Sequence, residues 1–151
     1  MRRQGAIVLR RFVYFLIAAL FATPAGAQSP TPTGVWLHAN KRIQVEIAPC
    51  GDRLCGKLVW FRWPNGADGL PLIDLKNDDP ALRKRPLLGL AILYGLRRTG
   101  DDSWEDGKIY NPDDGVDYNA TMSIQEDGTL RVRAYGLLPI FGKTLIWTRV
   151  Q

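Results

Sequence analysis

The stretch DYNATMSIQEDGTLRVRAYG, residues 117–136, decides the fold class of this chain. Every second residue in its two halves is apolar: Tyr118, Ala120, Met122 and Ile124 in the first half, and Leu130, Val132 and Ala134 in the second. A period of two is typical of a β-strand that buries one face. The Asp-Gly pair at 127–128 is typical of a hairpin turn. The stretch therefore predicts two antiparallel strands that share one apolar face.

Outward from this hairpin, six further segments have strand character and are separated by Gly, Asp, Asn and Pro. They are residues 34–39, 42–49, 54–63, 87–96, 104–111 and 143–150. Segment 87–96 also fits a helix by periodicity, but Gly89, Gly95 and the preceding Pro86 disfavour one. Eight short strands in series predict an all-β fold, a single eight-stranded antiparallel up-and-down barrel, because closure removes exposed sheet edges. A two-sheet sandwich is the alternative.

One connection, residues 64–86 between the third and fourth strands, is long, charged and rich in turn residues. Loops of this length in compact domains are usually functional or mobile. Asp79 followed by Pro80 predicts one helical turn over residues 80–83, since Asp caps helices and Pro suits their first position. The basic run 83–85 offers a contact for an anion or for the cell envelope, or forms a solvated loop face.

The N-terminal segment has the order of a secretory signal peptide. Four arginines at positions 2, 3, 10 and 11 precede an apolar run over 12–22, and Ala25-Gly26-Ala27 follows as a small-residue cleavage site. A transmembrane anchor is the alternative, but the apolar run is shorter than the ~20 residues a bilayer requires. We therefore expect a signal peptide at 1–27, a flexible leader at 28–33 and a barrel domain at 34–151, exported to the periplasm or secreted.

The charge balance changes when this leader is set aside. Four of the 20 basic residues lie in it, which leaves 16 basic against 15 acidic residues and no case for nucleic-acid binding.

The two cysteines, Cys50 and Cys55, flank a turn between two strands, and disulfides persist outside the cytoplasm. A four-residue turn would place them opposite each other within bonding range, so we predict a disulfide. A metal or redox pair is the alternative, but further ligands and the C-x-x-C spacing are lacking.

Several blocks in order resemble a known family. These are Gly34-x-Trp36, Cys50-Gly51 with Leu54-Cys55-Gly56-Lys57, Asp74 with Asn77, Arg83 with residues 85–89 (RPLLG), residues 107–112 (GKIYNP), Gly115 with Tyr118, and residues 147–149 (WTR). In this pattern the chain is similar to the exported bacterial family called domain of unknown function 2147. The resemblance implies a small β-barrel and no established activity. The opening G-x-W also resembles the lipocalin-like (calycin-type) arrangement, which implies that Arg149 of the last strand packs over Trp36.

The inventory of reactive side chains favours no particular enzyme. His38 is the single histidine, which disfavours the usual zinc sites and a Ser–His or Cys–His nucleophile. The sequence contains no P-loop and no dinucleotide fingerprint. The paired aspartates suit turns and caps. Whether the protein is an enzyme is left uncertain, leaning towards no, and no catalytic residue, metal or cofactor is assigned.

The hypothesis that remains is a binding module for a small, partly apolar ligand. With apolar residues facing inward, the lumen and its rim would be lined by Val45, Val59, Phe61, Tyr118, Met122 and Val132, with Asp74, Asn77 and Arg85 brought near by the long loop. The alternative is an envelope interaction protein with a packed barrel that acts through the 64–86 loop. The ligand, the partner and the oligomeric state are not specified by the sequence.

Overall fold

The computed structural model describes residues 31–150 of the chain. The expected signal peptide, residues 1–27, and the first part of the expected leader lie outside the described residues. Within them, no helix is of the length and hydropathy needed to cross a membrane.

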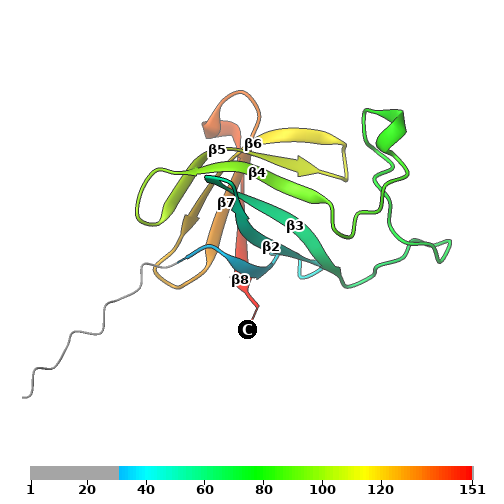
Figure 1. Cartoon of the computed structure of the whole chain (residues 1–151), viewed down its shortest axis with the longest axis horizontal. Helices are drawn as coiled ribbons and strands as arrows, with labels where there is room; N and C mark the ends of the chain where they lie inside the picture. The colour runs from blue at the N-terminus through cyan, green and yellow to red at the C-terminus, as the bar shows by residue number, and fades with distance from the viewer. Residues whose placement is uncertain (1–30, 151) are drawn as a thin grey trace, which may run out of the picture.

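Eight antiparallel strands follow one another around a closed barrel, and the first pairs with the last (Figure 1). The strands are β1 (Gly34–Leu37), β2 (Ile43–Cys50), β3 (Arg53–Phe61), β4 (Ala91–Arg98), β5 (Ser103–Asn111), β6 (Val116–Ile124), β7 (Leu130–Tyr135) and β8 (Lys143–Arg149). Two 3₁₀ turns, η1 (Pro80–Leu82) and η2 (Pro139–Phe141), lie in the β3–β4 and β7–β8 connections. The predicted up-and-down barrel is therefore confirmed, and the sandwich alternative is wrong.

The interior of the barrel is one apolar core made by the inward faces of the strands. The predicted alternation holds on β6 and β7, where Met122 and Val132 are paired across the two strands and buried. Packing is close even where side chains are lacking, since a Cβ on Gly107 would come within 2.6 Å of Leu96. The fully buried side chains of the core include Trp36, Val45, Ile47, Leu58, Leu93, Leu96, Met122, Leu130, Val132 and Trp147.

One lumen assignment was wrong. Simple alternation places Val59 inward, but Gln44 pairs with Trp60 while the next residue, Val45, pairs with Leu58. Val59 is therefore the extra residue of a β-bulge, which restarts the alternation one residue later. Leu58 takes the buried position and Phe61 packs against the core, whereas Val59 is not part of it.

The fourth strand begins later than the segment 87–96 suggested. Gly89 adopts a φ of +86°, which turns the chain before β4 starts at Ala91. Within β4, Gly95 has a φ of +75°, and the inward residues Leu93 and Leu96 are three apart instead of two. This irregularity gives a strand the apparent spacing of a helix, and the helical reading of the segment was wrong.

The predicted disulfide between Cys50 and Cys55 is confirmed, but the two cysteines are not directly opposite each other on β2 and β3. The strands β2 and β3 extend to a tight turn at Gly51 and Asp52, so that Cys50 pairs with Arg53 and not with Cys55. The bond to Cys55 spans a Cα–Cα distance of 5.7 Å, within the range that disulfides require. It closes the β2–β3 hairpin at its turn.

Candidate functional site

The β3–β4 loop, residues 62–90, extends from one end of the barrel and is held by its own hydrogen bonds (Figure 1). A β-bridge joins Ile73 to Pro86, so the outgoing and returning arms of the loop run side by side. The tip carries η1, and the side chain of Asp79 accepts a hydrogen bond from Ala81 N, as the predicted cap requires. The long loop is thus an ordered element of the fold.

A buried polar cluster fastens this loop to β5. The carboxylate of Asp74, with 0% of its surface exposed, accepts hydrogen bonds from Tyr110 Oη at 2.7 Å, Asn77 Nδ2 at 2.9 Å and Arg85 Nε at 2.9 Å. Arg85 adds a second contact to it at 2.8 Å. Asn77 Nδ2 also donates to Tyr110 Oη at 3.0 Å. The buried carboxylate thus has hydrogen-bond partners in place of water, and a charge removed from water requires such partners.

The cluster controls the ionisation of its members. Burial by itself raises the pKa of Asp74, but the hydrogen bonds from Tyr110, Asn77 and Arg85 outweigh it and hold that pKa below its ordinary value. Burial, followed by the hydrogen bond to Asp74, raises the pKa of Tyr110. At neutral pH the pair is therefore a carboxylate and a neutral phenol joined by a hydrogen bond, which holds the loop in place.

A glycine contact completes the attachment. Gly115, in the turn between β5 and β6, has a φ of +77°, and a Cβ built on it would lie 2.0 Å from the carbonyl oxygen of Lys76. The backbone of the loop therefore touches the β5–β6 turn directly. Asn77 lies next to this contact, so the glycine and the polar cluster fix the same part of the loop.

Between the attached loop and the outer face of the barrel is a groove of about 650 Å³. We call it the loop groove. Its barrel side is formed by residues on the outward side of β4, β5 and β6, because Tyr94 pairs outward with Lys108, and Tyr110 with Asp117. It is lined by Asn77, Asp78, Asp79, Leu82, Arg85, Ala91, Tyr94, Tyr110, Gly115, Val116 and Asp117.

The groove has more carboxylates than cations. Its one guanidinium, that of Arg85, is already paired with Asp74, while Asp78, Asp79 and Asp117 also line it. Tyr94 Oη donates a hydrogen bond to Asp117, and burial followed by this bond raises the pKa of Tyr94 far above its ordinary value. The groove thus presents a fixed carboxylate beside an aromatic ring.

Most of the basic side chains in the run 83–85 bind other groups of the same loop. The side chain of Arg83 donates to the backbone carbonyls of Asn77 and Asp78, and Arg85 binds Asp74. Both guanidinium groups therefore shape the loop.

The residues assigned from the sequence divide into two groups. Val45, Met122 and Val132 are buried in the core, and Phe61 and Tyr118 pack against it, with the Tyr118 hydroxyl donating to Asp114. None of these five lines the loop groove. The second group, Asp74, Asn77 and Arg85, forms the cluster that anchors the loop, and the sequence had grouped these three together. Sequence reasoning did not assign the other residues of the groove to a site, among them Asp78, Asp79, Tyr94 and Asp117. The sequence did contain one indication of a site on the outer face. If Ile109 faces inward, alternation places the next residue, the large aromatic Tyr110, on the outside of the barrel.

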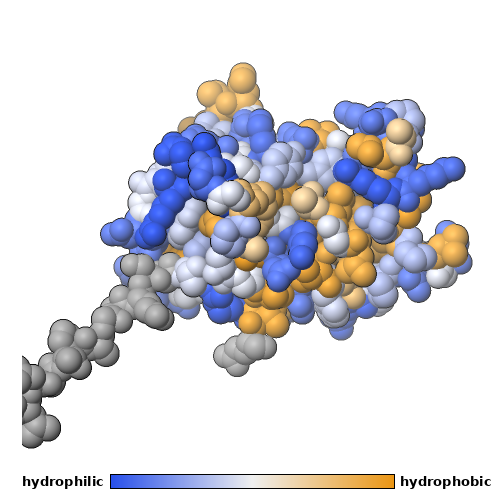
Figure 2. Space-filling view, viewed as in Figure 1, coloured by the Kyte–Doolittle hydropathy of each residue, from blue (hydrophilic) through white to orange (hydrophobic). Residues whose placement is uncertain are grey.

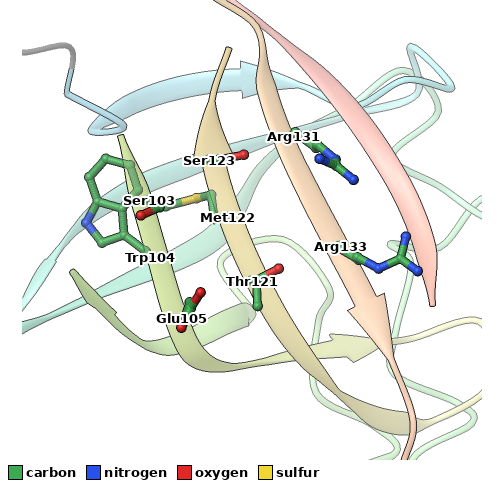
Figure 3. Close-up of a pocket in the computed structure, with 8 residues that line it drawn as sticks. All are labelled: Ser103, Trp104, Glu105, Thr121, Met122, Ser123, Arg131 and Arg133. Carbon is green, nitrogen blue, oxygen red and sulfur yellow. The ribbon is translucent and has the colours of Figure 1, made fainter. Parts of the chain in front are cut away.

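A second, smaller cleft of about 170 Å³ lies across β5, β6 and β7 (Figure 3). Arg131 and Arg133 contribute to it from alternate positions of β7, and Glu105 and Thr121 come from β5 and β6. Trp104 and Met122, both members of the core, also line it. Its volume is below the few hundred Å³ typical of a site for an organic ligand.

His38 lies just after β1, where its ring is 5.9 Å from that of Trp147 and burial lowers its pKa. Over residues 31–150, no three side chains of His, Cys, Asp or Glu are grouped so that they could hold a metal ion. The loop groove combines ligand-sized volume with fixed polar groups.

Comparison with known proteins agrees with this architecture. Residues 34–149 match the family model described as "Uncharacterized protein conserved in bacteria (DUF2147)". The solved structure of protein HP1028 from the human pathogen Helicobacter pylori, a protein described as belonging to the lipocalin family, is similar at a TM-score of 0.68 and 25% identity. That likeness covers 79% of this chain and 82% of the other. Among curated proteins, none matches the sequence.

Proposed function

This chain belongs to the family of uncharacterized proteins conserved in bacteria (DUF2147), and we propose that it is an exported binding module whose ligand occupies the loop groove. The proposal keeps ligand binding, for which a lipocalin-like barrel is suited, but moves the site from the lumen to the outer face. The packed core supports this, because fully buried side chains from several strands fill the inside of the barrel.

The composition of the groove selects the class of ligand. Among the described residues that line the groove, the one cation is Arg85, which is paired with Asp74, so the carboxylates of Asp78, Asp79 and Asp117 are in excess. Tyr94, Leu82 and Val116 supply apolar surface beside these carboxylates. We infer a small organic cation with an apolar or aromatic part, which would satisfy both halves of the lining. The observation that carries this proposal is the excess of carboxylates in a groove of ligand size.

Export is part of the proposal and rests on the order of charge, apolar run and small residues in positions 1–27. The Cys50–Cys55 disulfide supports the same compartment, since such bonds persist outside the cytoplasm. Mass spectrometry of the exported protein tests this part, and we expect its N-terminus at Gln28.

The envelope-interaction alternative is favoured by one feature of the same loop. Leu70 and Leu75 are each 64% exposed, and Ile73 lies between them with part of its surface in solvent. Exposed apolar side chains in a row on an ordered loop are suited to contact with a partner. If this alternative holds, Leu70→Ser with Leu75→Ser abolishes capture of a partner without changing the binding of small cations.

Isothermal titration with three probes of similar shape tests the proposed ligand class. Phenethylammonium is the cation, 2-phenylethanol the neutral control and 3-phenylpropanoate the anion. We expect saturable binding of the cation alone, weakened by salt. Asp117→Asn should weaken it about tenfold, the effect of losing roughly 1.4 kcal/mol, while the amide oxygen can still accept from Tyr94.

Asp127→Asn provides the matched control, because Asp127 lies in the β6–β7 turn and does not line the groove. It should bind the cation as the unaltered protein does. Equal binding of all three probes, or undiminished binding by Asp117→Asn, would refute the carboxylate-based site.

A further inference from the structure

The β7–β8 loop, residues 136–142, exposes a group of apolar side chains and is distinct from the loop groove. Its sequence GLLPIFG contains no charged or polar side chain. Leu137 is 93% exposed, Ile140 76% and Phe141 82%. The segment stands above the barrel in Figure 1 as an orange loop, away from the β3–β4 loop, and Figure 2 shows the projection as hydrophobic. Apolar surface concentrated in this way on a monomer commonly marks an interaction site.

The backbone of this loop is held from below. The guanidinium of Arg133 donates to the carbonyl oxygens of Pro139 and Ile140, and Asn119 Nδ2 donates to Gly136 O. Inside the loop, Phe141 N bonds Leu138 O and Gly142 N bonds Pro139 O. These bonds turn the carbonyl groups inward and leave the apolar side chains outside. They also satisfy backbone groups that an environment poor in water would otherwise leave unpaired.

The residues that flank the loop in the sequence carry charge of one sign. From Thr129 to Val150 the sequence has no acidic residue, and Arg133 and Lys143 lie close to the two ends of the loop. Lys108 adjoins it through a hydrogen bond to Asn119, the residue that holds Gly136. Exposed apolar side chains with basic residues at their base are typical of segments that lie in the interface of an anionic membrane.

We propose that the β7–β8 loop inserts its apolar tip into the surface of a lipid bilayer that carries anionic headgroups. Leu137, Ile140 and Phe141 enter the boundary between headgroups and acyl chains, and Lys143 binds headgroup phosphates. A lipid surface fits this shape better than a protein does. A stable protein interface buries roughly 800 Å² on each partner, and this feature is a single narrow projection.

Vesicle sedimentation tests the proposal on the exported chain, with the same N-terminus confirmed for every variant. The probes are vesicles of phosphatidylcholine alone and of phosphatidylcholine mixed with phosphatidylglycerol. We expect the protein to sediment with the mixed vesicles and much less with the neutral ones. Ile140→Ser with Phe141→Ser should weaken that binding by about tenfold for each side chain removed from the bilayer. Lys143→Gln should reduce the preference for the anionic vesicles.

Leu70→Ser with Leu75→Ser is the matched control, since it removes two exposed apolar side chains from the other long loop. It should leave vesicle binding unchanged, and circular dichroism should report the same fold for all variants. Three results would overturn the proposal: no sedimentation of the unaltered protein with either vesicle, undiminished binding by the loop variant, or an equal loss in the control. Loop-dependent self-association in analytical ultracentrifugation without vesicle binding would assign the loop to a protein contact instead.

Discussion

The guanidinium of Arg149 lies over the indole of Trp36, with its central carbon 4.3 Å from the ring centroid. The two residues are also paired across β1 and β8, so the stacking occurs at the seam where the barrel closes. Arg149 donates to the backbone carbonyls of Thr31 and Thr33, and Trp36 Nε1 donates to Pro32 O at 2.7 Å. The described end of the expected leader, residues 31–33, is therefore attached to the barrel at this seam. The predicted contact between Trp36 and Arg149 is confirmed.

Two buried tryptophans provide a matched pair for testing what the hydrogen bond at this end contributes. Trp36 Nε1 has a partner, whereas Trp147 Nε1 has none within residues 31–150. Trp36→Phe removes a hydrogen bond and part of the ring under Arg149, but Trp147→Phe removes a buried donor that was unpaired. We expect the free energy of unfolding to fall more for Trp36→Phe, by about 1–2 kcal/mol. Urea denaturation measures both, and equal losses would contradict the assignment.

The disulfide closes a small loop and should contribute accordingly. The bond joins residues five apart, and the entropy model gives about 2 kcal/mol for a loop of this size. Cys50→Ser with Cys55→Ser should lower the free energy of unfolding by this amount and leave the barrel folded. Thiol labelling of the unaltered protein under denaturing, non-reducing conditions should find no free cysteine, and stoichiometric labelling would show the bond to be absent.

The fold was predictable because most strands keep a strict period of two. Met122 and Val132 could be placed in the core from alternation alone, and they are there. Prediction failed where a strand has an extra residue. The bulge at Val59 exchanges inward and outward positions, and the irregularity at Gly95 imitates helical spacing. Such bulges depend on pairing with a neighbouring strand, and the sequence of one strand does not reveal that pairing.

The candidate site was predictable only in part. The sequence grouped Asp74, Asn77 and Arg85 in the long loop, and the structure joins them through Tyr110. The expectation of a ligand in the lumen depended on space inside the barrel, which is set by the volumes of side chains from all eight strands together. The loop groove arises from the way the loop folds onto the outer face of β4–β6. That docking depends on tertiary contacts such as Gly115 with Lys76, which local patterns do not encode.

The anchoring cluster should make stability depend on acid pH. The pKa of Asp74 in the folded protein lies below its unfolded value of about 3.9. The unfolded chain therefore binds the proton first as pH falls, and the stabilisation present above pH 4 is lost as pH falls towards the folded pKa. Asp114 and Asp127, whose pKa values are also lowered, contribute in the same direction.

Asp74→Asn separates the contribution of this residue from the others. At neutral pH it should cost about 2–3 kcal/mol, less than the 3–5 kcal/mol of a fully buried pair, because Arg85 retains access to water. The difference from the unaltered protein should shrink as the pH falls below the unfolded pKa of about 3.9. Urea denaturation at a series of pH values measures it, and two parallel curves would show that Asp74 does not titrate in this way.

Gly115 tests whether the loop groove depends on contact between the loop and the barrel. Alanine there must adopt a φ of +77° and place its Cβ 2.0 Å from Lys76 O, a distance at which the loop has to move. Gly128→Ala is the matched control, since Gly128 has nearly the same φ, +78°, with no atom within 4 Å of its added Cβ.

Gly128→Ala should lower the free energy of unfolding by about 1–2 kcal/mol from backbone strain alone. Gly115→Ala should exceed this and raise the hydrogen-exchange rates of the amides of Asp74 and Asn77, which are bonded within the loop. It should also weaken binding of phenethylammonium, whereas Gly128→Ala should not. If the two variants lose the same stability and the loop amides keep their protection, the contact of Gly115 with Lys76 does not hold the groove in shape.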